Sequence, residues 1–203
     1  MDWSVVHALN GVLVSRDWLE DPITVGATAL VPIFAAATVG LWLLARFESD
    51  AVWKRCCISS LLAAALALGV NQVLAHLVWA RPRPFTAHPD GVHLFAGGSL
   101  DPSFPSDHAA AAFAIAVAVL IVSRRLGLAF IVVAAVIATS RVVEGLHYPT
   151  DVLAGALVGT LAAVTVSFGA RPVVTWVAER VAVIVDPVAD VAVRAITKPA
   201  RRR

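Results

Sequence analysis

Three short polar segments of this chain contain the residue types that phosphoryl transfer requires. The segments are Arg81-Pro82-Arg83-Pro84, Pro105-Ser106-Asp107-His108, and Ser140-Arg141 followed by His147 and Asp151. Guanidinium groups hold phosphate oxygens through paired hydrogen bonds, and a histidine beside a carboxylate can attack phosphorus. Each segment borders a long apolar stretch, where charge is costly and is rarely retained without a use. We therefore expect the three segments to form one phosphate site.

The first segment is expected to end a helix and to present an arginine. Pro82 and Pro84 disfavour helical conformation in the residues before them, so Arg83 should extend from a stiff stretch of chain toward the phosphate. Arg81 has two possible roles, as a second phosphate contact or as a contact to lipid headgroups, and we favour the second.

The second segment precedes an alanine-rich helix. Ser106 is a favourable N-cap, and the free N–H groups at a helix start attract phosphate. His108 would then lie in the first helical turn. Considered alone, an ordinary helix cap with an exposed histidine is an equally good interpretation of this segment.

The third segment pairs a histidine with a carboxylate. His147 and Asp151 are four residues apart, so they share a face if a helix begins near Tyr148, and Pro149 fits its first turn. Such a carboxylate fixes the tautomer of the imidazole and prepares the other nitrogen to attack. Considered alone, a pair that only secures a helix end is the simpler interpretation. Glu144 could adjust the pKa of His147 or pair with an arginine, and the sequence does not decide.

Composition places these segments in a membrane protein. Only 15% of the 203 residues are charged, 59% are hydrophobic, and the mean hydropathy is +0.82. Soluble domains carry about a quarter charged residues, so we expect an integral membrane protein with one compact all-α domain. The adjacent Cys56 and Cys57 offer neither a disulfide framework nor a metal-binding spacing, and nothing indicates a nucleic-acid partner.

The apolar stretches predict a polytopic helical bundle with about five to six transmembrane helices. Long uncharged stretches cover residues 22–45, 56–80 and 152–170, and shorter ones cover 109–123 and 126–140. Crossing a membrane takes about 20 residues, so the shorter stretches suffice only if the polar segments extend them. Within one domain, 1–203, we expect an interfacial segment 1–21, a transmembrane core 22–168 and a cytoplasmic amphipathic tail 169–203, whose helix is interrupted near Pro187.

Charged residues outside these stretches predict the orientation. If the basic turn 46–55 lies in the cytoplasm, the turn with Arg124 and Arg125 and the basic tail lie there too, in agreement with the positive-inside rule. All three polar segments then lie on the external side. Arg81 and Arg83 are exceptions to the rule on that side, and a bound anion would explain them.

The three motifs resemble those of the type 2 phosphatidic acid phosphatase (PAP2) superfamily. The resemblance consists of Arg-Pro, then Pro-Ser-x-His, then Ser-Arg-x5-His-x3-Asp, and the layout is similar over nearly the whole chain. This long three-part pattern is specific. The stretches most similar to the bacitracin-resistance type of undecaprenyl-diphosphatase are Arg-Pro-Phe at 83–85, Phe-Pro-Ser-Asp-His at 104–108 and Gly-Leu-His-Tyr-Pro-Thr-Asp at 145–151.

The resemblance implies a role for each motif residue. His147 would be the nucleophile that forms a phosphohistidine, Asp151 would orient it, and His108 would protonate the departing lipid phosphate and then assist water. Phosphate oxygens would be held by Arg83, Ser106, Arg141 and the backbone N–H of Asp107. The family implies no metal and no cofactor. The implied reaction is hydrolysis of a polyprenyl diphosphate to the monophosphate, at the external face of the plasma (inner) membrane.

Two positions depart from the broad family pattern. The lysine seven residues before the motif arginine is replaced by His76, which can donate to phosphate if protonated, although we favour a packed polar residue inside the helix. The glycine of Pro-Ser-Gly-His is replaced by Asp107, whose carboxylate would repel phosphate and is expected to turn toward Arg81 or the loop. The bacitracin-resistance branch is similar at Asp107 and tends to lack the lysine, so both departures support that branch.

Other functions fit part of the sequence. A phosphatidylglycerophosphate or phosphatidate phosphatase would use the same motifs, because they recognise phosphate and not the lipid tail. A non-catalytic lipid-binding or transport protein and a haloperoxidase fit less well, and the oligomeric state is undetermined.

In the loop 85–104, His88, Asp90, His93 and Asp101 could bind a divalent ion, but their spacing is not a recognised ligand set. The simpler interpretation of residues 85–104 is a polar loop that could cover the phosphate site and binds no metal.

Overall fold

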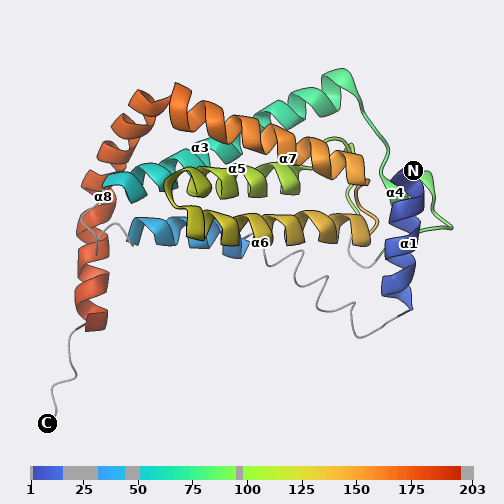
Figure 1. Cartoon of the computed structure of the whole chain (residues 1–203), viewed down its shortest axis with the longest axis horizontal. Coiled ribbons are helices and arrows are strands. Elements are labelled where there is room, and N and C mark those ends of the chain that lie inside the picture. Colours follow the sequence, from blue (N-terminus) through green and yellow to red (C-terminus); the bar gives the residue numbers. More distant parts are fainter. Residues whose placement is uncertain (1, 16–31, 44–50, 95–97, 198–203) are drawn as a thin grey trace, which may run out of the picture.

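The computed structural model describes residues 2–15, 32–43, 51–94 and 98–197, with side chains up to residue 191. Every regular element in these ranges is a helix (Figure 1), which confirms the predicted all-α fold. The elements are α1 (Asp2–Val14), a helix Pro32–Leu43, α3 (Ala51–Val73) with its π-helical continuation η2 (Leu74–Val78), α4 (Pro84–Ala87), α5 (Asp107–Val122), α6 (Arg124–Val143), α7 (Pro149–Val164) with its π-helical continuation η3 (Thr165–Gly169), and α8 (Arg171–Thr197).

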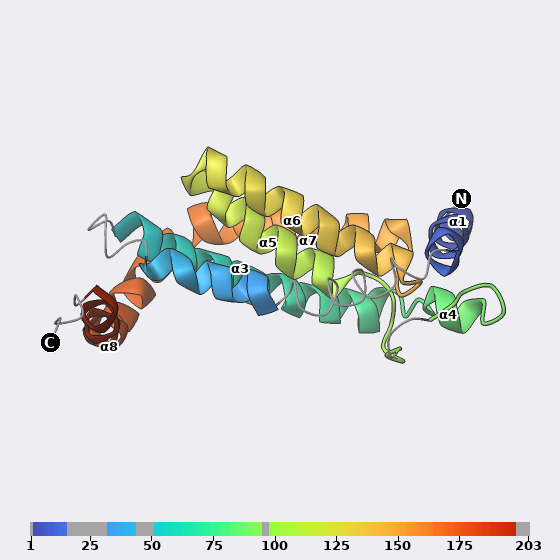
Figure 2. The same ribbon diagram turned by 90° about the horizontal axis from the view of Figure 1, so that it is seen from below.

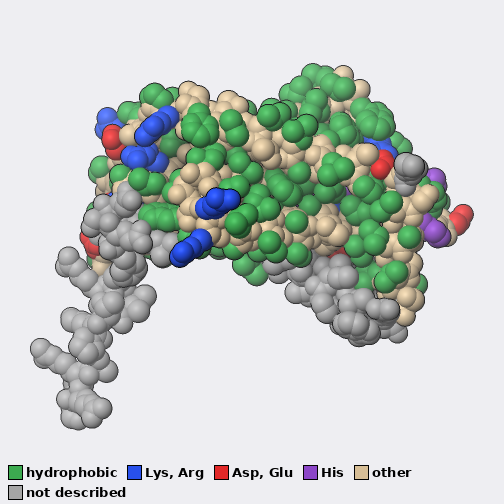
Figure 3. All heavy atoms as spheres, viewed as in Figure 1, with side chains coloured by type: hydrophobic (Ala, Val, Ile, Leu, Met, Phe, Trp, Pro, Cys, Tyr) green, Lys and Arg blue, Asp and Glu red, His purple; other side chains and the backbone are tan. Residues whose placement is uncertain are grey.

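The described helices include the apolar segments that the sequence predicts to cross a membrane. Three are long and apolar enough to do so, Ala51–Val78, Arg124–Val143 and Pro149–Gly169, and two shorter apolar helices are Pro32–Leu43 and Asp107–Val122. The remainder of the first predicted stretch, 22–31 and 44–45, lies outside the described residues. On the face shown in Figure 3, hydrophobic side chains cover the middle of the bundle and charged ones gather toward its ends. The chain is therefore an integral membrane protein.

Helix α5 lies at the centre of the bundle, in contact with α3, α6 and α7 (Figures 1 and 2). Its alanines form much of the interior, and Ala110, Ala114 and Ala116 have no exposed surface. Small side chains lose little rotamer entropy and let neighbouring backbones approach closely, which is how helices pack in a membrane. The position of α5 therefore sets the positions of the three helices around it.

Gly155 and Gly159 place α7 directly against α5. Their small-xxx-small spacing predicts close packing, and the structure confirms it. A Cβ atom added to Gly155 would lie 2.4 Å from the main-chain oxygen of Ser106, and one added to Gly159 would lie 2.2 Å from that of Ala110. This contact brings the start of α5 next to the start of α7, where the main-chain N–H of Ser106 donates to the main-chain oxygen of Asp151 at 3.0 Å.

One end of the bundle gathers the three polar segments. Helices α3 and α6 end there, α5 and α7 begin there, and α1 and α4 lie beside it (Figure 2). Gly145, with φ at 72°, allows the tight turn from α6 toward α7, because this conformation is favourable only without a Cβ atom. The connection is short enough to keep the third motif at the same end as the other two.

Helix α8 differs from the expectation at Pro187. The helix continues from Arg171 to Thr197 with Pro187 inside it, so the predicted interruption is wrong. Proline removes one main-chain hydrogen bond, and a helix tolerates this loss when neighbouring contacts hold it in place. Asp186, directly before the proline, forms an ion pair with Lys54 of α3 and accepts a hydrogen bond from Trp42 at 3.0 Å.

Candidate active site

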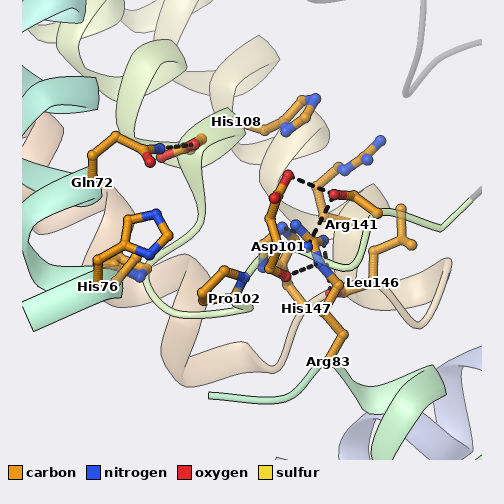
Figure 4. Close-up of a pocket in the computed structure, with 13 residues that line it drawn as sticks. Gln72, His76, Arg83, Asp101, Pro102, His108, Arg141, Leu146 and His147 are labelled. Atoms are coloured by element: carbon orange, nitrogen blue, oxygen red, sulfur yellow. Dashed lines mark hydrogen bonds between the residues drawn. The ribbon is translucent and has the colours of Figure 1, made fainter. Parts of the chain in front are cut away.

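A cavity of about 310 Å³ lies at the end of the bundle where the polar segments meet (Figure 4). Side chains from α3, η2, α5, α6 and the adjoining loops line it. The polar lining residues are Gln72 in α3, His76 in η2, Arg83, Ser99 and Asp101 in the loops beside α4, Asp107 and His108 at the start of α5, Arg141 at the end of α6, and His147 before α7. Residues of all three motifs therefore share one cavity.

The imidazole of His147 is held in one tautomer. Its Nδ1 atom lies 2.7 Å from the main-chain oxygen of Ser103, and because a carbonyl only accepts, Nδ1 carries the proton. The Nε2 atom accepts a hydrogen bond from Nη1 of Arg83 at 3.3 Å. The side chain is only 3% exposed, and this burial, together with the charge of Arg83, lowers the pKa of His147 well below its usual value. A neutral ring with an unprotonated Nε2 is the nucleophilic form of histidine.

Asp151 supports His147 through Ser103 and not by a direct hydrogen bond. Its Oδ2 atom is 3.9 Å from Nδ1 of His147, which is too far for a hydrogen bond. The same oxygen accepts hydrogen bonds from the Ser103 hydroxyl and, at 2.8 Å, from the main-chain N–H of Tyr148. The expected start of the helix is confirmed, with Tyr148 as N-cap and Pro149 in the first turn. Asp151 thus anchors the residue whose carbonyl sets the tautomer.

Two arginines bring positive charge to the cavity. Arg83 donates from Nε to the main-chain oxygen of Asp101 at 2.9 Å and from Nη1 to that of Leu146 at 3.3 Å. Nη1 of Arg141 lies 3.0 Å from a carboxylate oxygen of Glu144, without an aligned hydrogen bond. The Nε atom of Arg141 has no hydrogen-bond partner within the described part of the chain. A buried guanidinium whose Nε–H donor has no partner is suited to an additional anionic ligand such as phosphate.

Glu144 is the counter-ion of Arg141. Its side chain is fully buried, and burial raises the pKa of the carboxyl while the charge of Arg141 acts in the opposite direction. Of the two roles that the sequence leaves open, the structure supports the ion pair with an arginine. The pair anchors Arg141 at the wall of the cavity, because separating two buried charges would be costly.

The structure places the side chains of Asp107 and His76 in surroundings other than those expected from the sequence. The Asp107 carboxylate turns toward α3, where it accepts hydrogen bonds from the side-chain amides of Asn71 at 2.8 Å and Gln72 at 3.1 Å, and not toward Arg81 or the loop. His76 is exposed and lines the cavity (Figure 4), so the packed position that we favoured is wrong. It lies in η2, and π-helical turns are frequent at functional sites.

Arg81 does not line the cavity, so the structure does not support the alternative of a second phosphate contact. Its Nη1 atom lies 2.6 Å from Oδ1 of Asp151 and 2.8 Å from the hydroxyl of Thr150, and its Nη2 atom lies 3.1 Å from the Asp2 carboxylate of α1. The guanidinium also lies over the ring of Tyr148, 3.7 Å from its centre. Both terminal nitrogens of Arg81 and the face of its guanidinium thus contact protein groups. The side chain connects α1, through Asp2, to α7, through Asp151.

Ser106 does not occupy the phosphate-binding position that the family resemblance implies. The residue is fully buried and does not line the cavity. It caps α5, as the sequence predicts, since its hydroxyl accepts from the main-chain N–H of Ala109 at 3.5 Å. This supports the interpretation of Ser106 as an ordinary helix cap.

Sequence reasoning missed the contribution of the loop before α5. The carbonyl of Ser103 holds His147, and the carbonyl of Asp101 holds Arg83. Main-chain atoms make both contacts, so no pattern of residue types could have identified them. The possible metal ligands of the preceding loop are not clustered, because no group of three His, Cys, Asp or Glu residues within the described ranges could hold an ion. His88 instead stacks on Trp3, with ring centres 3.9 Å apart.

Comparison with known proteins supports the same conclusion as the motifs. Residues 56–173 match the PAP2 superfamily. Undecaprenyl-diphosphatase BcrC of Bacillus subtilis (strain 168) is 27% identical over 161 residues, which cover 79% of this chain and 80% of that protein. YbjG of Escherichia coli (strain K12) is 31% identical over 162 residues, which cover 79% of this chain and 78% of that protein.

Solved structures share the fold. The crystal structure of Aquifex aeolicus LpxE aligns with a TM-score of 0.64 at 23% identity, over 80% of this chain and 92% of that chain. The family match spans more than half of the sequence and contains Arg83, His108, Arg141 and His147. The protein therefore belongs to the PAP2 superfamily of membrane phosphatases.

Proposed function

We propose that the protein hydrolyses undecaprenyl diphosphate, or a related polyprenyl diphosphate, to the monophosphate and inorganic phosphate. The observation that carries this proposal is the setting of His147, whose Nε2 faces a cationic cavity while its Nδ1 is held by Ser103. The substrate class is supported by the similarity to BcrC, which covers most of both chains.

In the first half-reaction, Nε2 of His147 attacks the terminal phosphorus, and the bond between that phosphorus and the bridging oxygen breaks. His108 gives its proton to the bridging oxygen, which leaves on the polyprenyl monophosphate. Arg83 and Arg141 stabilise the negative charge on the transferring group, which is the main catalytic requirement of phosphoryl transfer. The Nδ1 proton of His147 remains on the ring, hydrogen-bonded to the carbonyl of Ser103.

In the second half-reaction, water attacks the phosphorus of the phosphohistidine and the N–P bond breaks. The proton of the water moves to His108, and the electron pair returns to Nε2 of His147. Inorganic phosphate leaves, and His108 is again the acid for the next cycle. One water is consumed for each diphosphate cleaved. His76, at the wall of the same cavity, is proposed as a further phosphate contact when it is protonated.

We further propose that the cavity opens on the external side of the plasma membrane. The opposite end of the bundle carries Arg55, Arg124 and Arg171, and positive charge is typical of a cytoplasmic end. Helices α1 and α8 would then lie along the two interfaces. An external site suits the recycling of a carrier lipid used in cell-wall synthesis.

Phosphate release from undecaprenyl diphosphate by the purified protein in detergent tests the proposal. The wild type should release phosphate with and without a chelator. His147→Ala should reduce kcat by about 10³-fold or more, because the nucleophile and its partners act as a unit. The matched control is His88→Gln, which changes a histidine that lies outside the cavity lining and stacks on Trp3. This variant should retain wild-type activity.

A panel of lipid phosphates in the same detergent separates the alternatives. Higher kcat/KM on phosphatidylglycerophosphate or phosphatidate than on the polyprenyl diphosphate would favour the glycerolipid phosphatase. Equal phosphate release by the wild type and His147→Ala would favour a protein that binds lipid without catalysis. Loss of activity with chelator would contradict the mechanism described above.

A further inference from the structure

A second cavity lies at the other end of the bundle. Its volume is about 220 Å³, and the start of α3, the end of α5, η3 and the start of α8 line it. Arg55 lies in this cavity and Gln72 lines the candidate active site. An α-helix rises about 1.5 Å per residue, so these two positions on α3 are about 25 Å apart. The second cavity is therefore separate from the site described above.

Two arginines of this cavity have no counter-ion within the described part of the chain. Arg55 is half-buried, and Arg171 is the first residue of α8. Among the residues that the structure describes, neither forms an ion pair or a side-chain hydrogen bond, whereas the adjacent Lys54 is paired with Asp186. The N-terminus of a helix carries partial positive charge, which disfavours a cation such as Arg171 in the first turn. An anion in the cavity would offset part of this positive charge.

The remaining polar lining comes from two serines. Ser59 of α3 and Ser167 of η3 both line the cavity. The η3 segment is the counterpart of η2, which carries His76 of the first cavity. π-Helical turns displace side chains from the regular helical face and are frequent at functional sites. Both described π-helical segments thus contribute to a cavity, one at each end of the bundle.

The rim of the cavity is apolar and faces outward. Ile121 and Val122 at the end of α5 are exposed, and Phe168 of η3 is 67% exposed. An aqueous anion would gain nothing from such a rim, whereas an amphipathic ligand could place its charged group inside and its chains outside. The combination matches a phospholipid better than a free ion.

We propose that this cavity binds the phosphate of an anionic glycerophospholipid from the membrane leaflet at that end of the bundle. The phosphate would lie between Arg55 and Arg171, and the acyl chains would follow Ile121 and Phe168 outward. Basic cavities between transmembrane helices are suited to phosphate headgroups, and guanidinium is the group that holds them best. The bound lipid would join α8 to α3 and α5. This proposal does not depend on the phosphatase activity.

Native mass spectrometry of the full chain, released from nanodiscs that contain phosphatidylglycerol and phosphatidylcholine, tests the proposal. The wild type should retain phosphatidylglycerol in preference to phosphatidylcholine. Arg55→Gln combined with Arg171→Gln should weaken retention by about tenfold or more, since each removes a charge-assisted contact. Arg124→Gln combined with Arg125→Gln is the matched control, because both arginines are exposed and lie outside the cavity. This control should retain the lipid.

Two further variants and one competition experiment show where the lipid is bound. Arg83→Gln, in the candidate active site, should leave the retained lipid in place, and its loss there would assign the lipid to the first cavity. Lysine at both Arg55 and Arg171 should preserve much of the binding, which distinguishes a lost contact from a misfolded protein. Inorganic phosphate should not displace the lipid, and displacement at millimolar concentration would indicate a site for free phosphate. Equal retention by the glutamine variant and the wild type would overturn the proposal.

Discussion

The Nδ1 atom of His147 lies 2.7 Å from the main-chain oxygen of Ser103. The carboxylate of Asp151 is farther from that atom, at 3.9 Å, and holds the Ser103 hydroxyl instead. A main-chain carbonyl is present whatever side chain occupies the position, so the tautomer of His147 does not depend on the carboxylate alone. The loop before α5 is consequently part of the catalytic apparatus that we propose.

This arrangement predicts a graded response to substitution. Asp151→Asn should lower kcat by about 10 to 10²-fold, because the ring loses a nearby negative charge but keeps its hydrogen bond to Ser103. Ser103→Ala should lower kcat by less than about tenfold, since the carbonyl remains and only the hydroxyl is lost. Steady-state kinetics on polyprenyl diphosphate would measure both. An Asp151→Asn variant as inactive as His147→Ala would show that the carbonyl does not maintain the tautomer.

The role of His108 as acid can be tested with the leaving group. His108→Ala should reduce kcat on polyprenyl diphosphate by about 10² to 10⁴-fold. On p-nitrophenyl phosphate, whose leaving group departs without a proton, formation of the phosphohistidine should be much less affected. A burst of nitrophenolate equal to the enzyme concentration, followed by slow turnover, is expected in rapid-mixing experiments. Equal losses on both substrates, without a burst, would remove His108 from this role.

The pH dependence follows from the lowered pKa of His147. Protonation of Nε2 removes the attacking electron pair, and burial disfavours that protonation. The imidazole should therefore stay neutral, and kcat/KM should not fall on its account, until the pH is well below about 6.5. Because the charge of Arg83 contributes to this lowering, Arg83→Gln should move the acidic limb to higher pH. Phosphate release between about pH 4 and pH 9 would measure both profiles, and an unchanged limb in Arg83→Gln would contradict the assignment.

Arg81 and Arg83 should respond differently to the same substitution. Arg83→Gln should raise KM and lower kcat, because Arg83 lines the cavity. Arg81→Gln should lower kcat with little change in KM, because Arg81 contacts Asp151 and Asp2 but not the cavity. It should also lower the thermal stability, since the buried Asp151 loses its ion-pair partner, a change that costs about 3–5 kcal/mol in other proteins. A rise in KM for Arg81→Gln would restore the phosphate contact that the sequence leaves open for Arg81.

The packing of α7 on α5 predicts the effect of a single methyl group. Gly159→Ala would place a Cβ atom 2.2 Å from the main-chain oxygen of Ala110, so the helices must separate. Overpacking of this kind costs about 1–3 kcal/mol. The matched control is Gly69→Ala in α3, where a Cβ atom meets nothing within 4 Å. Thermal unfolding in detergent should show a lower midpoint for Gly159→Ala only, and equal midpoints would contradict the close approach.

Much of the fold could be predicted because it depends on local properties of the chain. Apolar stretches located the long apolar helices among the described residues, and Ser106 and Pro149 located the starts of α5 and α7. Capping and proline geometry involve residues a few positions apart, so the sequence contains the needed information. Pro187 was misjudged because the stability of α8 there depends on contacts of Asp186 with other helices.

The sequence alone also determined that histidines and arginines of three segments meet in one cavity, because residue type and helix direction suffice for that inference. It assigned Arg83 to the phosphate but left two roles open for Arg81, since each arginine precedes a proline and has the same charge. Only the tertiary structure decided between them, by bringing Asp151 and Asp2 within reach of one guanidinium and leaving the other at the cavity. Ion pairs act over a few ångströms in space, and the two carboxylates that pair with Arg81 belong to residues 70 and 79 positions away in the chain.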